Sequence, residues 1–124
     1  MISDRELDVL KAYDNRGHNL LSVYLRLDTS ARRQAANDQF VQQVRACLDN
    51  HDPPPMLREI IQEDIEIVSV YISSNAKRCG AGLAIFSCAS ELFWRAYSLP
   101  LPVPTQVAVG PRFDIDPLLQ VVAS

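Results

Sequence analysis

The chain has 124 residues, of which 48% are hydrophobic and 22% charged, and its formal net charge at pH 7 is −3. This length suits one globular domain with a sizeable core, and the composition excludes a disordered chain. The negative charge gives no reason to expect strong attraction of the whole domain to nucleic acid or anionic membranes, so an RNA contact requires a local basic patch or a further part of a longer chain.

The N-terminal segment predicts a short helix followed by a strand. Ser3 and Glu6 have the spacing of a capping box, so we expect a helix from about residue 4 to residue 13. Residues 20–27, LLSVYLRL, alternate between apolar side chains and more polar ones. This alternation predicts a strand that is buried on one face only.

Two long helices are predicted next. Residues 28–50 carry an apolar stripe at helical spacing, which predicts a single helix. The segment HDPPP at 51–55 ends it, because prolines disfavour helix before them and Pro55 suits the first turn of a new helix. Residues 55–75 include the strand-like run IVSVYI, but their apolar positions recur mostly at spacings of three and four. We therefore predict a second helix that forms an antiparallel hairpin with the first.

The last third of the chain predicts three strands and a final helix. Residues 82–87 and 91–97 form a β-hairpin around a turn at 88–90. Prolines at every second position from 100 to 104 require an extended segment, QVAV at 106–109 predicts a strand, and Pro117 starts a helix. The resulting order α-β-α-α-β-β-β-α predicts an α+β (mixed α/β) fold, in which a four-stranded mixed sheet packs with a helical hairpin and short terminal helices.

Few residues of the sequence suggest catalysis or metal binding. His51 lies beside two aspartates and could act as a base or metal ligand, although a solvated loop histidine explains it more simply. Cys79 follows Arg78, a cation that can lower a thiol pKa, but no positioned base is evident. We therefore expect no enzyme activity, no catalytic residue, no metal and no cofactor. A small hydrolase around His51 or Cys79 is the least favoured alternative.

Two further sets of polar residues have simple interpretations. The three cysteines, Cys47, Cys79 and Cys88, lack the spacing of metal ligands and are expected to be reduced thiols. The acidic residues of the second helix are predicted to form its solvated face: Glu59, Glu63, Asp64 and Glu66.

Candidates for contact with RNA or a protein partner come from two basic pairs and the aromatic residues. Arg32 and Arg33 stand at a helix start, and Lys77 and Arg78 stand in the loop before the hairpin. Tyr24, Trp94 and Phe113 could stack on bases, with packing in the core or against another domain as the alternative for Trp94. The predicted contact set is Arg32, Arg33, Lys77, Arg78, Trp94 and Phe113.

The chain carries no sign of a membrane or secretory segment. No signal peptide opens it, and no apolar run approaches the ~20 residues that a membrane span needs. We therefore expect a soluble, cytoplasmic protein without membrane contact.

Three stretches resemble the N-terminal domain of class-I peptide chain release factors of eukaryotes and archaea, and more closely the bacterial release-factor-like proteins of that superfamily. They are LLSVYLRLDTS at 20–30, GAGLAIFSC at 80–88 and LPLPVPTQVAVGPRFDIDPLL at 99–119. The resemblance implies a non-catalytic recognition or docking module acting in translation. It also implies an N-terminal module of a longer multidomain chain, with the ribosome, tRNA or mRNA and sibling domains as partners.

The resemblance does not extend to the residues with which eukaryotic and archaeal factors read stop codons. Their Asn-Ile-Lys-Ser loop would fall at the corner between the helices, which here reads LDNHDPPP. Their Tyr-x-Cys-x-x-x-Phe segment aligns with Val107, Val109 and Phe113, so only the phenylalanine is kept. Stop-codon decoding by these motifs is therefore not expected. The Gly-Gly-Gln tripeptide for peptidyl-tRNA hydrolysis belongs to another domain of the family and is absent from this sequence.

A function of a different class stays open. An exposed strand edge or the aromatic hairpin could make the domain a protein–protein interaction or dimerisation module without RNA contact. The sequence leaves the oligomeric state undetermined.

Overall fold

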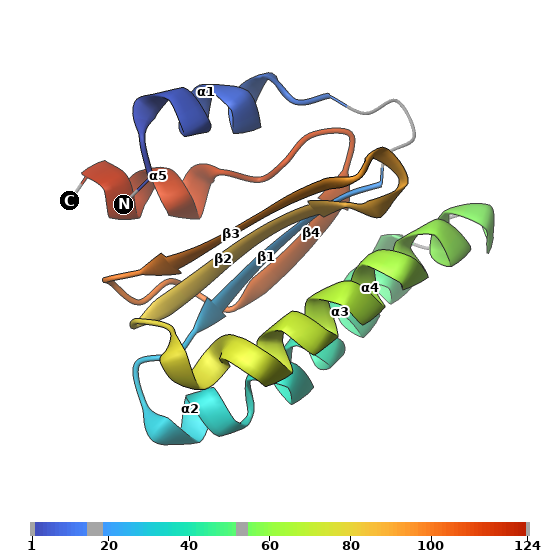
Figure 1. Ribbon diagram of the computed structural model, residues 1–124. Helices are drawn as coiled ribbons and strands as arrows, with labels where there is room; N and C mark the ends of the chain where they lie inside the picture. The colour runs from blue at the N-terminus through green and yellow to red at the C-terminus, as the bar shows by residue number, and fades with distance from the viewer. Residues whose placement is uncertain (1, 15–18, 52–54, 124) are drawn as a thin grey trace.

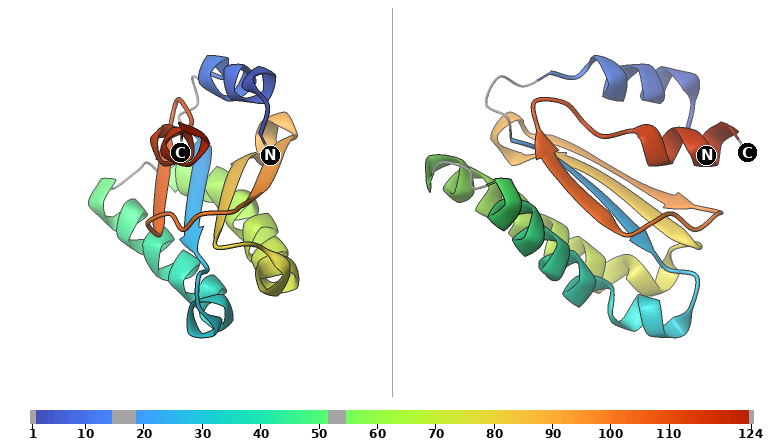
Figure 2. Two further views of the ribbon diagram at one scale, coloured as in Figure 1. Left: turned by 90° about the vertical axis from the view of Figure 1, so that its left-hand side faces the viewer. Right: turned by 180° about the vertical axis from the view of Figure 1, so that it is seen from behind.

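The computed structural model describes residues 2–14, 19–51 and 55–123. Within these ranges it contains five α-helices and one four-stranded sheet. The sheet lies between two layers of helices (Figures 1 and 2). The predicted α+β fold is confirmed. None of the described helices is both long enough and apolar enough to cross a bilayer.

The sheet differs from the prediction in strand direction. Its strands are β1 (Leu20–Arg26), β2 (Gly82–Cys88), β3 (Phe93–Leu99) and β4 (Gln106–Gly110), in the order β3-β2-β1-β4. All three pairings are antiparallel, so the sheet is not mixed. Between β1 and β2 the chain passes through two antiparallel helices, so it reverses direction three times and β2 runs antiparallel to β1. A single crossover helix would have made the two strands parallel.

The helical hairpin covers one face of the sheet. It consists of α3 (Ala36–His51) and α4 (Pro55–Asn75), and the short α2 (Ser30–Gln34) precedes it (Figure 1). Phe40, Val68 and Ile72 are among its core residues. The second predicted helix is confirmed, but the first is broken at Ala35. Thr29 caps the separate first turn by accepting a hydrogen bond from the Arg32 amide at 3.1 Å.

Two terminal helices cover the opposite face: α1 (Asp4–Ala12) and α5 (Asp116–Ala123) (Figure 2). The capping role of Ser3 is confirmed, because its hydroxyl accepts a hydrogen bond from the Glu6 amide at 3.3 Å. The prediction that β1 is buried on one face only was wrong, since this second layer also covers it. Tyr24 is fully buried there, and its hydroxyl donates to the carbonyl oxygen of Asp114.

The β2–β3 hairpin is confirmed, with its turn slightly later than predicted. The turn contains the 3-10 helix η2 (Ala89–Glu91) and Leu92, whose φ is 55°. Residues 100–105 then connect β3 at one edge of the sheet to β4 at the other (Figure 2). Three strand spacings of about 4.8 Å amount to about 14 Å, which six residues span when extended. Gly82 permits the passage, because a Cβ there would lie 2.8 Å from the Leu101 carbonyl oxygen.

Candidate functional site

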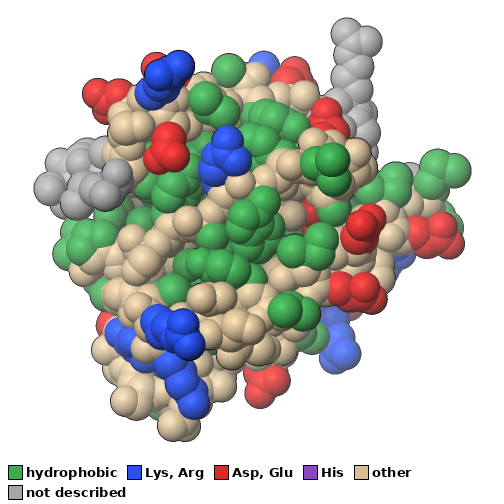
Figure 3. Space-filling model, viewed as in Figure 1, with side chains coloured by type: hydrophobic (Ala, Val, Ile, Leu, Met, Phe, Trp, Pro, Cys, Tyr) green, Lys and Arg blue, Asp and Glu red, His purple; other side chains and the backbone are tan. Residues whose placement is uncertain are grey.

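Four of the predicted contact residues gather at one end of the domain: Arg32, Arg33, Lys77 and Arg78. We call them the basic cluster. The first two lie on α2 and the other two on the 3-10 helix η1 (Ala76–Arg78), which contacts α2. In Figure 3 blue side chains gather at the lower left, where Figure 1 draws α2. The fold thus joins two basic segments that are far apart in the sequence.

Arg33 holds these two segments together. Its Nε donates to the Leu27 carbonyl oxygen at 2.9 Å. Its terminal nitrogens donate to the carbonyl oxygens of Lys77 and Gly80, each at 3.1 Å. A planar guanidinium can serve three such acceptors because its donors form a fixed fork. Arg33 is therefore a positioning residue for η1, since these donors are committed to the backbone.

Arg32 is partly exposed and belongs to a small ion-pair network. It lies 3.5 Å from Asp28, which also pairs with Arg26 at 3.0 Å. The hydrogen bond from Arg26, with the charges of both arginines, holds the pKa of Asp28 below its ordinary value. Asp28 also lines an open hollow beside Arg33 and Lys77. The negative charge of Asp28 offsets part of the positive charge at this end, whereas Lys77 and Arg78 are exposed.

Replacing Arg33 by alanine is expected to lower the free energy of unfolding by about 1–2 kcal/mol, because three carbonyl acceptors lose a charged donor that is partly exposed. Urea denaturation measures this change. Arg33→Lys should recover only part of it, since an ammonium group lacks the fork. Arg32→Ala is the matched control, with an expected loss within about 1 kcal/mol for a surface ion pair. Equal stability of Arg33→Ala and the wild type would contradict the positioning role.

Trp94 lies away from the basic cluster. It pairs with Ser87 near the start of β3, whereas the end of β3 near Leu99 adjoins Gly80, whose amide donates to Ser98 Oγ at 2.7 Å. Five strand residues separate the two places by about 17 Å. The half-buried Trp94 ring packs edge-on against Tyr71, with ring centroids 5.3 Å apart. Trp94 and the basic cluster therefore do not form one site.

Phe113 is a core residue and not a surface contact residue as predicted. It is 7% exposed, and its ring lies 5.5 Å from that of Tyr13, 5.4 Å from that of Phe86 and 5.3 Å from that of Phe93. Helices α1 and α5 cover this face of the sheet, so the ring is enclosed. Tyr24 is buried in the same layer and is equally unable to stack on a base.

The three cysteine side chains are packing residues in the structure. All three cysteines are buried, and burial raises the pKa of each. The Cys79 thiol donates to the Asn75 carbonyl oxygen at 3.3 Å, and the charge of Arg33 opposes the rise of its pKa only in part. A raised pKa disfavours the thiolate that nucleophilic catalysis requires. The side chains of His18 and His51 lie outside the described residues.

Asp64 is the polar residue that the sequence analysis placed wrongly. The prediction put it on the solvated face of α4, but it is fully buried. Its Oδ1 accepts hydrogen bonds from the Ser87 hydroxyl and from the Ala89 amide, the latter at 2.8 Å. Glu59, Glu63 and Glu66 are exposed as predicted. The spacing of Ile61, Val68 and Ile72 indicates that Asp64 is buried, because position 64 falls on the same apolar stripe of the helix.

Asp64 fixes the turn of the hairpin to α4. Within the described part of the chain its Oδ2 has no hydrogen-bond partner, and burial raises the pKa of the carboxyl above its ordinary value. The described residues contain no group of three or more histidine, cysteine, aspartate or glutamate side chains that could hold a metal ion together.

Comparison with known proteins identifies a fold relative but no family. No family model and no curated protein matches the chain. A solved structure described as "Archaeal protein" is similar, with a TM-score of 0.66 at 17% sequence identity. The match covers 95% of this chain and 34% of that one, so this chain spans about a third of its relative's length. At this identity the similarity concerns the fold alone.

Proposed function

We propose that the domain is a non-catalytic recognition and docking module, the N-terminal module of a bacterial release-factor-like protein that acts in translation by associating with the ribosome or with RNA. Two observations support the proposal. Residues 20–30, 80–88 and 99–119 resemble that superfamily. The basic cluster provides a local positive surface on a domain whose net charge is −3.

The observation that carries the proposal is the set of hydrogen bonds from Arg33 to the backbone around η1. These bonds fix the segment from which Lys77 and Arg78 project, beside Arg32 on α2. Lysine and arginine side chains that contact phosphates orient a protein on RNA without reading its sequence. Arg33 therefore sets the geometry, and the exposed cations make the contact.

Replacing Lys77 and Arg78 together by alanine is expected to weaken binding to single-stranded RNA or to ribosomes at least about tenfold at low salt, since two phosphate contacts are lost. The slope of log K against log salt should fall by about 1.4, which is two contacts at about 0.7 each. Titration of labelled RNA, and co-sedimentation with ribosomes, at several salt concentrations measure both quantities.

The matched control is the double variant Arg5→Ala/Lys11→Ala, which removes two exposed cations from α1 on the opposite side of the sheet. This variant changes the net charge by the same amount as the Lys77/Arg78 variant. Because α1 lies on the opposite side of the sheet from the basic cluster, the RNA affinity and the salt slope should stay nearly unchanged. An equal loss of affinity in both double variants would mean that only the total charge of the domain matters for binding. Absence of any RNA or ribosome association of the wild-type chain at low salt would refute the translational function.

A second candidate function is that of a protein–protein interaction module. The observation that favours it is the position of β3, which forms an edge of the sheet and carries aromatic side chains on both of its faces. An exposed edge presents backbone donors and acceptors with which another strand can pair.

A further inference from the structure

The outer side of α4 carries a second apolar stripe. The inner stripe of this helix, which includes Ile61, Val68 and Ile72, is buried. Four exposed apolar side chains follow another line along the helix: Met56, Ile60, Ile67 and Val70. With Glu63 between them, the spacings are 4, 3, 4 and 3 residues, so all five share one face over about 21 Å of helix. We call these five residues the outer stripe. A helix that is apolar on two sides has the pattern of one that packs on both.

The exposed apolar side chains are concentrated on this side of the molecule. Seven large hydrophobic side chains are exposed in the described part of the chain; four are in the outer stripe, and a fifth, Leu92, adjoins it. In Figure 3 hydrophobic and acidic side chains lie next to each other at the right, where Figure 1 draws the N-terminal half of α4. Single exposed apolar residues are common on protein surfaces, whereas a contiguous group indicates a contact surface.

A hollow of about 220 Å³ joins the outer stripe to the turn of the β2–β3 hairpin. Ile67, Leu92 and Trp94 are among its apolar walls, and Glu63 lies beside them. Other walls belong to the hairpin turn, which Asp64 binds to α4. These hydrogen bonds fix the two sides of the hollow relative to each other. The hollow is therefore preformed, and it suits one aliphatic side chain next to a carboxylate.

Leu92 is an unfavourable residue for this place in the isolated chain. Its φ of 55° lies in the left-handed region that favours glycine, and its side chain is 94% exposed. The backbone is therefore strained, and an apolar group contacts water. A partner that covers the hollow would bury this side chain, which gives leucine a physical reason at this position.

The charges on and beside the outer stripe are mostly negative. Glu63 lies within it, and Glu59 and Glu66 are exposed neighbours on the same helix. The single basic residue of α4, Arg58, is half-buried and donates to a carbonyl oxygen of α3 at 3.3 Å. Arg45 of α3 lines a groove together with Glu66. Three carboxylates therefore stand against one exposed guanidinium, so a complementary partner brings positive charge.

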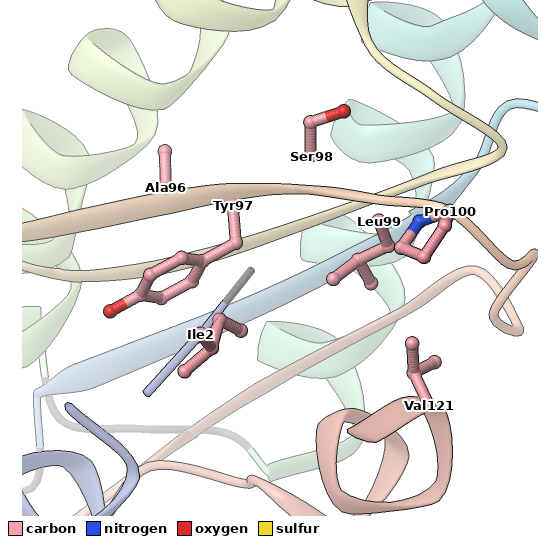
Figure 4. A pocket seen from close by; sticks show the side chains of 7 residues that line it. All are labelled: Ile2, Ala96, Tyr97, Ser98, Leu99, Pro100 and Val121. Atoms are coloured by element: carbon pink, nitrogen blue, oxygen red, sulfur yellow. The ribbon is translucent and has the colours of Figure 1, made fainter. Parts of the chain in front are cut away.

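The pocket at the C-terminal end of β3 differs in this respect. It also has a volume of about 220 Å³ and lies on the face covered by α1 and α5, with Ile2, Tyr97, Leu99 and Val121 among its walls (Figure 4). None of the described residues that line it is charged. Its lining therefore gives no indication of a partner's chemistry, whereas the lining of the hollow beside α4 does.

We propose that the outer stripe binds an amphipathic helix of a partner protein, which has apolar side chains at the same spacing and lysine or arginine beside them. One apolar side chain of this helix enters the hollow, and its cations pair with Glu59 and Glu63. A second copy of the chain is a poor partner, because two outer stripes would place the same carboxylates against one another. Nucleic acid and anionic membranes are repelled by the same charges. The proposal goes beyond both candidate functions and depends neither on the basic cluster nor on the β3 edge.

Binding of synthetic helical peptides to the whole chain tests the proposal. The probe is a peptide of about 18 residues, ~27 Å long as a helix, with leucines at spacings of three and four and lysines in the flanking positions. We expect a dissociation constant in the micromolar range, because one helix face is smaller than a standard interface. The same peptide with glutamates in place of the lysines should bind at least about tenfold more weakly. Fluorescence anisotropy of the labelled peptides at several salt concentrations measures both affinities.

Two double variants separate the apolar contribution from the charged one. Ile67→Ala/Val70→Ala should raise the dissociation constant of the lysine peptide at least about tenfold at every salt concentration, because buried apolar contacts are not screened. Glu59→Gln/Glu63→Gln should raise it about fivefold at low salt and hardly at all at high salt, as expected for surface ion pairs.

The matched controls alter exposed residues of α1, on the opposite side of the sheet. They are Val9→Ala for the apolar pair and Asp4→Asn/Asp8→Asn for the acidic pair, and both should leave the dissociation constant nearly unchanged. RNA binding should be the same in all of these variants, because none of them alters the basic cluster.

Three results would overturn the proposal. One is failure of both peptides to bind. Another is an equal loss of affinity in the control and the outer-stripe variants, which would mean unspecific attraction of a cationic peptide to an acidic protein. The third is a wild-type dimer in sedimentation that Ile67→Ala/Val70→Ala converts to a monomer, since the outer stripe would then bind a second copy of the chain.

Discussion

Replacement of Phe113 by alanine is expected to lower the free energy of unfolding by about 3–5 kcal/mol, the usual range for a buried phenylalanine. The ring is nearly enclosed and contacts Tyr13, Phe86 and Phe93 from three different elements. Its loss would leave a cavity between the sheet and the layer of α1 and α5, where rigid neighbouring rings limit collapse. Urea denaturation followed by fluorescence and circular dichroism measures the change.

The matched variant is Phe113→Leu, which keeps most of the apolar volume and should cost clearly less than the alanine variant. The same pair of variants separates the two roles considered for this residue. If Phe113→Ala kept wild-type stability and lost RNA affinity, the ring would be a stacking residue and its position in the core would be refuted. We expect the reverse, with affinity retained by whatever fraction stays folded.

Replacement of Asp64 by alanine has the second largest expected effect, a loss of about 2–3 kcal/mol. It removes the acceptor for the buried Ser87 hydroxyl and for the Ala89 amide, and an unsatisfied buried polar group costs about 1–3 kcal/mol. Because these bonds join α4 to the hairpin turn, we expect hydrogen exchange of the Ala89 amide to accelerate more than that of amides in β1.

Asp64→Asn is the matched variant for the charge of this group. Desolvation raises the pKa of Asp64 in the folded state, so the carboxyl is more easily ionised in the unfolded chain. Its contribution to stability is therefore largest below the unfolded pKa of about 3.9 and falls as pH rises through the folded pKa. Asparagine does not ionise, so the stability of Asp64→Asn minus that of the wild type should increase with pH over this window.

Denaturation curves of both proteins from acidic to slightly alkaline pH measure this difference, in which the other carboxyl groups cancel. A difference independent of pH would mean that the pKa of Asp64 is not shifted. A difference that decreases with pH would mean that its hydrogen bonds from Ser87 and Ala89 outweigh desolvation and lower the pKa.

Local patterns along the chain were sufficient to place most of the helices and strands. Ser3 and Glu6 marked the start of α1, Pro55 marked the start of α4, and the spacing of apolar residues in 55–75 correctly favoured helix over strand. These signals involve residues within one or two turns of each other, so neighbouring side chains and backbone groups decide them. The α+β class followed from the order of these elements.

Burial could not be predicted from local patterns, because it depends on which segments, distant in the sequence, pack against each face of the sheet. The alternation in β1 indicated one buried face, but α1 and α5 come from the two ends of the chain and bury Tyr24 on the other. Asp64 reads as one of several acidic residues on α4, and only the approach of Ser87 and Ala89 from β2 and η2 makes it an internal acceptor.

In the candidate site, too, the sequence determined some features and only the tertiary structure decided others. The sequence identified the basic residues, but the role of Arg33 depends on two acceptors that lie more than forty positions away. Arg32 and Arg33 are adjacent in sequence, yet one pairs with Asp28 at the surface and the other donates to carbonyls beside η1. Side-chain type sets what a residue can donate or accept, whereas the tertiary fold fixes which acceptors lie within about 3 Å of it, because hydrogen bonds act only over that range.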